Sequence, residues 1–290
     1  MPIDPRADNG MTMIKKLIGA VAFMFACTGA YAAEGGYPLE TAPDRVNDVS
    51  ALQNGAKLFV NYCLNCHSAS SMRYNKLQDI GLTDEQIKEN LLFTGEKVGD
   101  LMTIAMRPED AKKWFGTIPP DLSVIARAKS INAGPSGADY IYTYMRTFYR
   151  DTARTTGWNN LVYPNVGMPH VLWERQGPRE LTTVAMHEVS GGGWERVTTT
   201  YDSQGFAEVK TEPVANFHGQ ATLEAKFKAL DPAKTANYDN DVADLTAFLS
   251  WMAEPQQLFR KQLGVWVLLF LGLFLLVAWR LNASYWKHVR

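Results

Sequence analysis

Two cysteines and a histidine in the run Cys63-Leu64-Asn65-Cys66-His67 constrain this chain more than any other feature. Thiols separated by two residues can reach the two vinyl groups at one edge of a porphyrin, and a histidine directly after the second cysteine can become a ligand of the iron. A zinc site would need further nitrogen or sulfur ligands close by, and a thioredoxin-type redox pair would need a βαβ context. The run therefore predicts one covalently attached haem c, with thioether bonds at Cys63 and Cys66 and His67 as an axial ligand.

The N-terminal segment predicts export. A basic pair at residues 15–16 precedes an apolar run at 17–27, and Ala30-Tyr31-Ala32 resembles a cleavage site. We expect residues 1–32 to be a signal peptide, with acylation at Cys27 as the alternative. Cleavage would leave Cys63 and Cys66 as the last two cysteines, in an oxidising compartment where they could also form a small disulfide.

The C-terminal end predicts a membrane anchor. Residues 263–279 are uncharged and apolar, at the lower limit of length for a membrane-spanning helix. We assign residues 33–257 to a haem domain in the periplasm, 258–280 to an anchor in the bacterial inner membrane, and 281–290 to a cytoplasmic tail. Arg280 at the end of the anchor and Lys287 and Arg290 in the tail agree with the positive-inside rule.

Apolar periodicity predicts a mainly α fold. Helices are expected at residues 51–62, 83–92, 108–115, 138–150 and 241–253. Thr83 and Gln86 form a candidate capping box for the second helix. Between Gly177 and Asn240 the glycine-rich and then β-branched pattern predicts a hairpin or an irregular surface excursion. With 46% hydrophobic residues a packed core is expected, and a net charge of −1 argues against a nucleic-acid partner.

A six-coordinate haem needs a second axial ligand. Met168 lies between Gly167 and Pro169, which keep this stretch out of a helix and stiffen it. We favour Met168, and His170 is its rival. The extended Pro119-Pro120 stretch could offer a carbonyl to His67 Nδ1–H, and Arg127 could pair with a haem propionate or remain a solvated helix residue.

Several longer motifs carry a family resemblance. The stretches "CLNCHSASSMRYNKL", "WFGTIPPDLSVIARA", "TGWNNLVYPNVGMPHVLW" and "FLSWMAEPQQLFRKQLGV" closely resemble the cytochrome c1 family of bacterial ubiquinol–cytochrome c reductases (cytochrome bc1 complexes). The resemblance is collinear from about residue 37 and includes the anchor. It implies a cytochrome c-like haem domain with loop insertions, in which the cofactor-binding and iron-ligating positions are Cys63, Cys66, His67, Pro120, Arg127, Tyr140 and Met168. Some bacterial relatives have an extra disulfide, for which this chain has no cysteines.

The resemblance also implies a function. Such a subunit takes single electrons from the Rieske iron–sulfur protein and gives them to a soluble or membrane-bound c-type cytochrome, beside cytochrome b in a dimeric complex. It does no bond chemistry alone, so the chain is an electron-carrying subunit of an oxidoreductase. Residues 79–110 contain eight acidic and three basic side chains, which suits a basic partner or simply a solvated face. Another membrane-anchored c-type cytochrome, and a haem peroxidase or sensor, are the alternatives.

Overall fold

In a computed structural model of the chain, residues 37–190, 192–215, 217 and 219–288 are described. The helices are α2 (Val49–Leu58), α3 (Asp84–Asn90), α4 (Pro108–Phe115), α5 (Ile125–Ala128), α6 (Gly137–Arg146), α7 (Trp173–Gln176), α8 (Pro232–Ala253) and α9 (Gln257–Tyr285), with short turns η2 (Phe59–Cys63), η3 (Tyr74–Ile80) and η4 (Trp286–His288). The strands are β1 (Ala69–Arg73), β2 (Leu101–Met102), β3 (Phe148–Arg150), β4 (Trp158–Asn160), β5 (Arg179–Glu188), β6 (Trp194–Tyr201), β7 (Ala207–Val214) and β8 (Thr222–Ala229). The predicted signal peptide, residues 1–32 with Cys27, lies outside the described residues.

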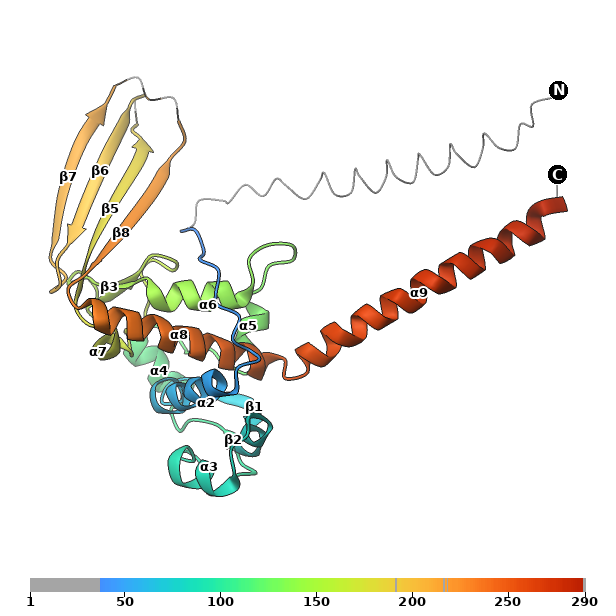
Figure 1. The fold of residues 1–290 in the computed structure, drawn as a ribbon. Coiled ribbons are helices and arrows are strands. Elements are labelled where there is room, and N and C mark those ends of the chain that lie inside the picture. The colour runs from blue at the N-terminus through green and yellow to red at the C-terminus, as the bar shows by residue number, and fades with distance from the viewer. Residues whose placement is uncertain (1–36, 191, 216, 218, 289–290) are drawn as a thin grey trace, which may run out of the picture. The chain divides into compact units, whose positions relative to one another are not determined.

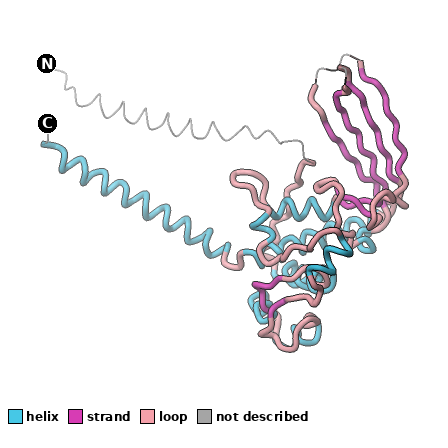
Figure 2. The backbone as a smooth tube through the Cα atoms, turned by 180° about the vertical axis from the view of Figure 1, so that it is seen from behind, coloured by secondary structure: helices cyan, strands magenta, loops and turns pink. Residues whose placement is uncertain are grey.

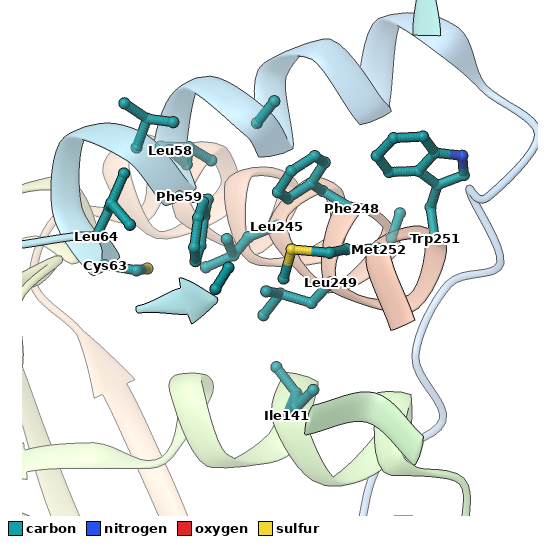
Figure 3. Close-up of a cluster of buried hydrophobic side chains, with 14 of the residues drawn as sticks. Leu58, Phe59, Cys63, Leu64, Ile141, Leu245, Phe248, Leu249, Trp251 and Met252 are labelled. Atoms are coloured by element: carbon teal, nitrogen blue, oxygen red, sulfur yellow. The ribbon is translucent and has the colours of Figure 1, made fainter. Parts of the chain in front are cut away.

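Helices α2 and α8 pack against each other in the main hydrophobic core (Figures 1 and 3). Phe59 and Phe248 bring their ring centres to 5.7 Å, and both side chains are fully buried. Gly55 allows this close approach, because a Cβ there would lie 2.2 Å from the carbonyl oxygen of Asp244. Cys63 belongs to the same cluster, so the predicted attachment site is part of the core rather than of a surface loop.

Two buried carboxylates on α8 connect it to its neighbours. Asp244 accepts hydrogen bonds from Arg45 at 2.8 Å and from Asn54 of α2 at 2.9 Å. Asp241 accepts one from Arg175 of α7 at 2.6 Å. Because buried carboxylates require such partners, α8 holds α2, α7 and the segment before α2 in one body.

Residues 179–229 form a four-stranded antiparallel sheet in the order β7-β6-β5-β8, which is labelled in Figure 1 and seen from behind in Figure 2. The register pairs Leu181 with Tyr201 on one side and with Phe227 on the other. These three side chains pack with Tyr149 and Leu161 in a small second cluster. This region therefore contains more β-structure than the predicted hairpin or irregular excursion. The mainly α assignment holds only in part, because strands are also present.

The predicted helices are found, with two boundary errors. The capping box of Thr83 and Gln86 is present at the start of α3. The helix expected at 138–150 ends at Arg146, since residues 148–150 pair with β4 as strand β3. The helix expected at 241–253 begins at Pro232, where Asp231 caps it; its first turns carry no apolar stripe and gave no periodic signal.

Helix α9 contains the predicted anchor, residues 258–280, and continues to Tyr285. It has 29 residues and none of them is buried. Among the described residues it is the helix long and apolar enough to cross a membrane.

Candidate functional site

The cysteine pair lies where α2 changes its winding. The backbone N–H of Leu64 donates to Phe59 O at 2.9 Å, a wider turn than that of an α-helix, and η2 ends at Cys63. The backbone N–H groups of Cys66 and His67 then both donate to Cys63 O, at 3.0 and 2.9 Å. Such single wide turns are frequent at functional sites. This one folds Cys63, Cys66 and His67 into a single tight turn.

Both cysteines are free, and both are present as thiols. Burial, followed by the neighbouring Cys66, raises the pKa of Cys63 to about 12. Burial also raises the pKa of Cys66, which is half-buried. An active redox pair needs an accessible thiolate with a lowered pKa. Within the described ranges no three His, Cys, Asp or Glu side chains are grouped to hold a metal ion. The zinc and redox alternatives therefore lose support.

His67 is held by the proline segment. Its Nδ1 lies 2.7 Å from the carbonyl oxygen of Pro120. Because a carbonyl can only accept, Nδ1 carries the proton and Nε2 keeps its lone pair for a metal. Burial lowers the pKa of His67, although the Pro120 bond and Asp121 act in the opposite direction, so the ring is neutral at neutral pH. The hydrogen bond expected from the sequence is present.

Asp121 fixes the proline segment in place, and sequence reasoning missed it. Its carboxylate accepts from the backbone N–H and the hydroxyl of Ser70, at 2.8 and 2.7 Å, and from the Ser123 N–H at 2.8 Å. The Asp-x-Ser pattern after the prolines was an available signal, because aspartate often accepts from the backbone two residues later. Asp121 thus links the loop that bears Pro120 to strand β1 beside His67.

Met168 lies in a non-helical loop, as predicted. A Cβ on Gly167 would be 2.6 Å from the carbonyl oxygen of Phe115, so glycine allows the loop to lie against the end of α4. The hydroxyl of Tyr144 donates to Met168 Sδ at 3.5 Å. Tyr144 stacks on Tyr140 of the same helix with ring centres 5.9 Å apart. Tyr144 was missed, although its i, i+4 spacing from Tyr140 placed the two on one helix face.

The rival ligand His170 is enclosed by aromatic rings. It is 1% exposed, stacks on Phe148 at 4.8 Å, and meets the edges of Trp158 at 5.0 Å and Tyr238 at 5.8 Å. Burial holds its pKa well below the usual value, so it is neutral. Neither ring nitrogen of His170 has a hydrogen-bond partner among the described residues, so the structure holds this ring by aromatic contacts alone.

The other predicted residues are partly assembled around the same cluster. Tyr140 and Met168 are half-buried and pack against the main core cluster, of which Cys63 is a member. Arg127 is exposed on α5 and makes no ion pair with the described residues, so its guanidinium is free to meet an acidic group. Two free thiols, a neutral imidazole with a free Nε2 and a thioether sulfur are the donor types that haem c takes. The residues present fit that group.

A C-x-x-C-H turn in the core, together with an apolar C-terminal helix, is typical of membrane-anchored c-type cytochromes. The family model described as "Cytochrome C1 family" matches residues 42–189 and 197–289. The chain belongs to this family, and is therefore a haem electron-transfer subunit of a bc1-type complex. Between its two matched ranges, the family model leaves residues 190–196 unmatched.

Two individual relatives are similar in sequence over nearly the whole chain, and a third over about three quarters of it. The chain is 40% identical to cytochrome c1 of Allochromatium vinosum, over 95% of this chain and 100% of the relative. It is also 40% identical to a protein named ammonia monooxygenase gamma subunit from Nitrosomonas europaea, over 96% of this chain and 100% of that protein. A protein named cytochrome b/c1 from Bradyrhizobium diazoefficiens is 26% identical over 78% of this chain and 31% of its own length.

Proposed function

We propose that the chain carries one covalently attached haem c and passes single electrons from the Rieske iron–sulfur protein to a c-type cytochrome. Cys63 and Cys66 would form the thioethers, each by adding its S–H across one vinyl double bond, and His67 and Met168 would be the axial ligands. The haem supplies a one-electron iron couple. The observation that carries this proposal is the imidazole of His67, which follows two free thiols in one turn and whose Nδ1 is fixed by Pro120 O at 2.7 Å.

Around that turn, other residues of the chain would orient the His67 and Met168 side chains and cover the haem. Pro120 keeps the His67 ring in one tautomer, and Asp121 keeps Pro120 in place. Arg127 would meet a propionate, and Tyr140 would cover the haem from α6. The Tyr144 hydroxyl bonds Met168 Sδ and so orients the thioether. These contacts would set the potential of the site and the access of water to it.

We also propose that the anchor holds this site at a membrane surface. We assign residues 258–280 to the bacterial inner membrane, the haem domain to the periplasm and residues 281–290 to the cytoplasm. The export signal predicted from the sequence and the unburied apolar helix α9 support this orientation. Cytochrome b and the Rieske protein would be neighbours in a dimeric complex, and the name of the Bradyrhizobium relative supports a cytochrome b partner.

Mass spectrometry of the processed chain tests the attachment. We expect the mass of the polypeptide plus one haem, and a Cys66→Ala variant that retains at most one thioether. A processed chain without added tetrapyrrole would refute the proposal.

Met168→Leu tests the distal ligand. Loss of the thioether should lower the midpoint potential by on the order of 100 mV while the haem stays attached. Met252→Leu, at a buried methionine in the same core, is the matched control and should leave the potential almost unchanged. An equal response of the two variants would show that Met168 is not the ligand. Carbon monoxide binding by the reduced wild type would favour the peroxidase or sensor alternative instead.

Copurification tests the partners. A b-type haem in the purified complex, read from a pyridine haemochrome spectrum, is the result expected for a quinol–cytochrome c reductase. The name of the Nitrosomonas relative suggests a monooxygenase complex as the second candidate. Copurification with a monooxygenase, and with no b-type haem, would favour that candidate.

A further inference from the structure

A cavity of about 660 Å³ lies outside the residues assigned to the haem. Its walls come from strands β3 and β4, helix α7, the start of β5 and the start of α8. None of the seven predicted cofactor and iron positions lines it. The family assignment gives it no role, so its chemistry has to be derived from its walls.

The cavity carries an excess of positive charge. Four basic side chains line it, Arg150, Arg175, Arg179 and Lys234, and Glu174 is the one acidic side chain in its walls. Arg175 is paired with Asp241, and Arg179 donates to the backbone carbonyl oxygens of Arg146 and Phe148. Arg150 and Lys234 make no ion pair with any residue in the described part of the chain. The positive charge here is therefore largely uncompensated by the protein.

Two buried donors in the cavity wall lack acceptors. The side chain of Gln176 is 1% exposed, and its Nε2 has no hydrogen-bond partner among the described residues. The buried Nε of Arg179 also has none. Buried donors in folded proteins are nearly always paired. Both unpaired groups are donors, so this wall can donate to a bound acceptor; the Gln176 side chain also lies close enough to His170 and Tyr238 to shift the pKa of each, in addition to the larger effect of burial.

Aromatic rings supply the remaining surface and hold one cation in place. The guanidinium of Arg150 lies 4.2 Å from the ring centre of Trp158 and 5.7 Å from that of Trp173. Tyr62 and Tyr149 also line the cavity. Cation–π contacts of this kind fix the direction of a guanidinium without neutralising it. The rings give the cavity flat apolar walls around a preset positive group.

We propose that this cavity binds a small anion, a carboxylate or phosphate group carried on a flat apolar body. Arg150 and Lys234 would pair with the acidic group, Gln176 and Arg179 would donate to its oxygens, and the Trp158 and Trp173 rings would face the apolar body. The volume is in the range of ordinary small-ligand sites. Arginine with neutral amide donors is a common means of binding such anions.

The site would also lie beside the cysteine turn. A second cavity of about 370 Å³ shares Tyr62, Trp158 and Trp173 with the first and is lined by Cys66. An anion bound here would favour the more positive, oxidised state of a haem attached at Cys66 and so lower its midpoint potential. This consequence rests on the proposed haem attachment, whereas binding itself does not.

Isothermal titration calorimetry on the detergent-solubilised complex tests the proposal. The probes are benzoate, the neutral isostere benzamide, and inorganic phosphate. We expect benzoate to bind at least about tenfold more tightly than benzamide, and more tightly than phosphate. Arg150→Gln combined with Lys234→Gln should weaken benzoate binding by at least about tenfold. Lys234→Gln alone, at an exposed position, should give part of that loss if the double variant fails to fold.

Lys226→Gln is the matched control, because Lys226 is an exposed lysine on β8 outside the cavity. It should bind benzoate like the wild type. No measurable heat with millimolar benzoate or phosphate would overturn the proposal and leave the cavity to water. Equal binding by the wild type and the cavity variants would place any anion elsewhere. Phosphate binding as tight as benzoate would overturn the role of the aromatic walls. A chain without haem that still bound benzoate would contradict the proposed function but not this site.

Discussion

The hydrogen bond from Tyr144 to Met168 makes the sharpest test of the site. Replacing Tyr144 with Phe removes one hydroxyl and leaves the ring, which stacks on Tyr140 and meets Phe148 edge-on at 5.1 Å. If Met168 is an axial ligand, the O–H donor withdraws electron density from the sulfur. A poorer sulfur donor disfavours the ferric state and raises the potential. Tyr144→Phe should therefore lower the midpoint potential.

The size of the shift follows from the hydrogen bond. A neutral hydrogen bond contributes about 0.5–1.5 kcal/mol, and the long 3.5 Å contact to sulfur argues for the lower part of that range. If about 0.5–1 kcal/mol separates the two oxidation states, the shift is about 20–45 mV for a one-electron couple. Burial raises the pKa of Tyr144 well above its usual value, so it remains a donor up to high pH. The shift should then be the same from about pH 6 to pH 9.

A redox titration of the purified complex, followed by the haem absorbance, measures this shift. Tyr142→Phe is the control, because Tyr142 lies on the same helix α6, is not one of the seven predicted cofactor and iron positions, and its hydroxyl makes no hydrogen bond with the described residues. Haem content should be equal in both variants. A Tyr144→Phe midpoint within a few millivolts of the wild type, or above it, would refute the assignment of Met168 as a ligand tuned by this hydroxyl.

Three further predictions concern packing, pH and charge. Gly55→Ala forces a Cβ against the backbone of α8 and should cost about 1–3 kcal/mol, seen as a lower thermal midpoint of the haem spectrum, while Gly99→Ala, with open space around it, should cost much less. Burial alone would raise the pKa of Asp121, but hydrogen bonds from Ser123 and Ser70 outweigh it and leave that pKa lowered. The carboxylate thus stabilises the fold above about pH 4 and loses this effect as the pH falls further. In a plot of thermal midpoint against pH, Asp121→Asn should therefore reduce the fall of the midpoint below about pH 4. An unchanged fall in that variant would show that Asp121 does not have this role. Residues 79–110 include three exposed acids without ion pairs to described residues, Glu85, Glu89 and Glu96. If this segment docks a basic cytochrome, replacing all three with glutamine should slow electron transfer at low salt only. Kinetics that do not depend on salt would exclude docking there.

The local part of the site was predictable from sequence because its signals are local. The spacing of Cys63, Cys66 and His67 fixes which atoms lie together in one turn. The glycine before Met168 and the proline after it predicted a non-helical loop, and the prolines at 119–120 predicted a carbonyl for His67. The cysteine turn and the Met168 loop depend on residues within a few positions and on rules of backbone geometry. The bond between His67 and Pro120 joins residues 53 positions apart, and only the extended form of the proline stretch was a local signal for it.

The strand order of the sheet and the hydrogen bond from Tyr144 to Met168 were not predictable in the same way. Strand β8, "TLEAKFKA", alternates apolar and polar residues, and this period of two was the available signal for a strand. The pairing of β8 with β5, and the order β7-β6-β5-β8, are set by contacts between residues far apart in the sequence, so no short segment predicts them. The same holds for the bond from Tyr144 to Met168, which joins residues 24 positions apart.

The sheet is an excursion that returns to its starting point. The backbone N–H of Leu230 donates to the carbonyl oxygen of Pro178 at 3.0 Å, so the chain leaves α7 and re-enters α8 at adjacent positions. All seven predicted cofactor and iron positions lie before Pro178, and the core pair α2 and α8 lies outside the excursion. The haem-binding fold is therefore topologically complete without the sheet. The cavity is not, because Arg179, Ser203 and Gln204 in its walls belong to the excursion. The sheet thus contributes one part of the cavity wall, whereas the aromatic rings, the other three basic side chains and the site at Cys63, Cys66 and His67 come from the rest of the chain.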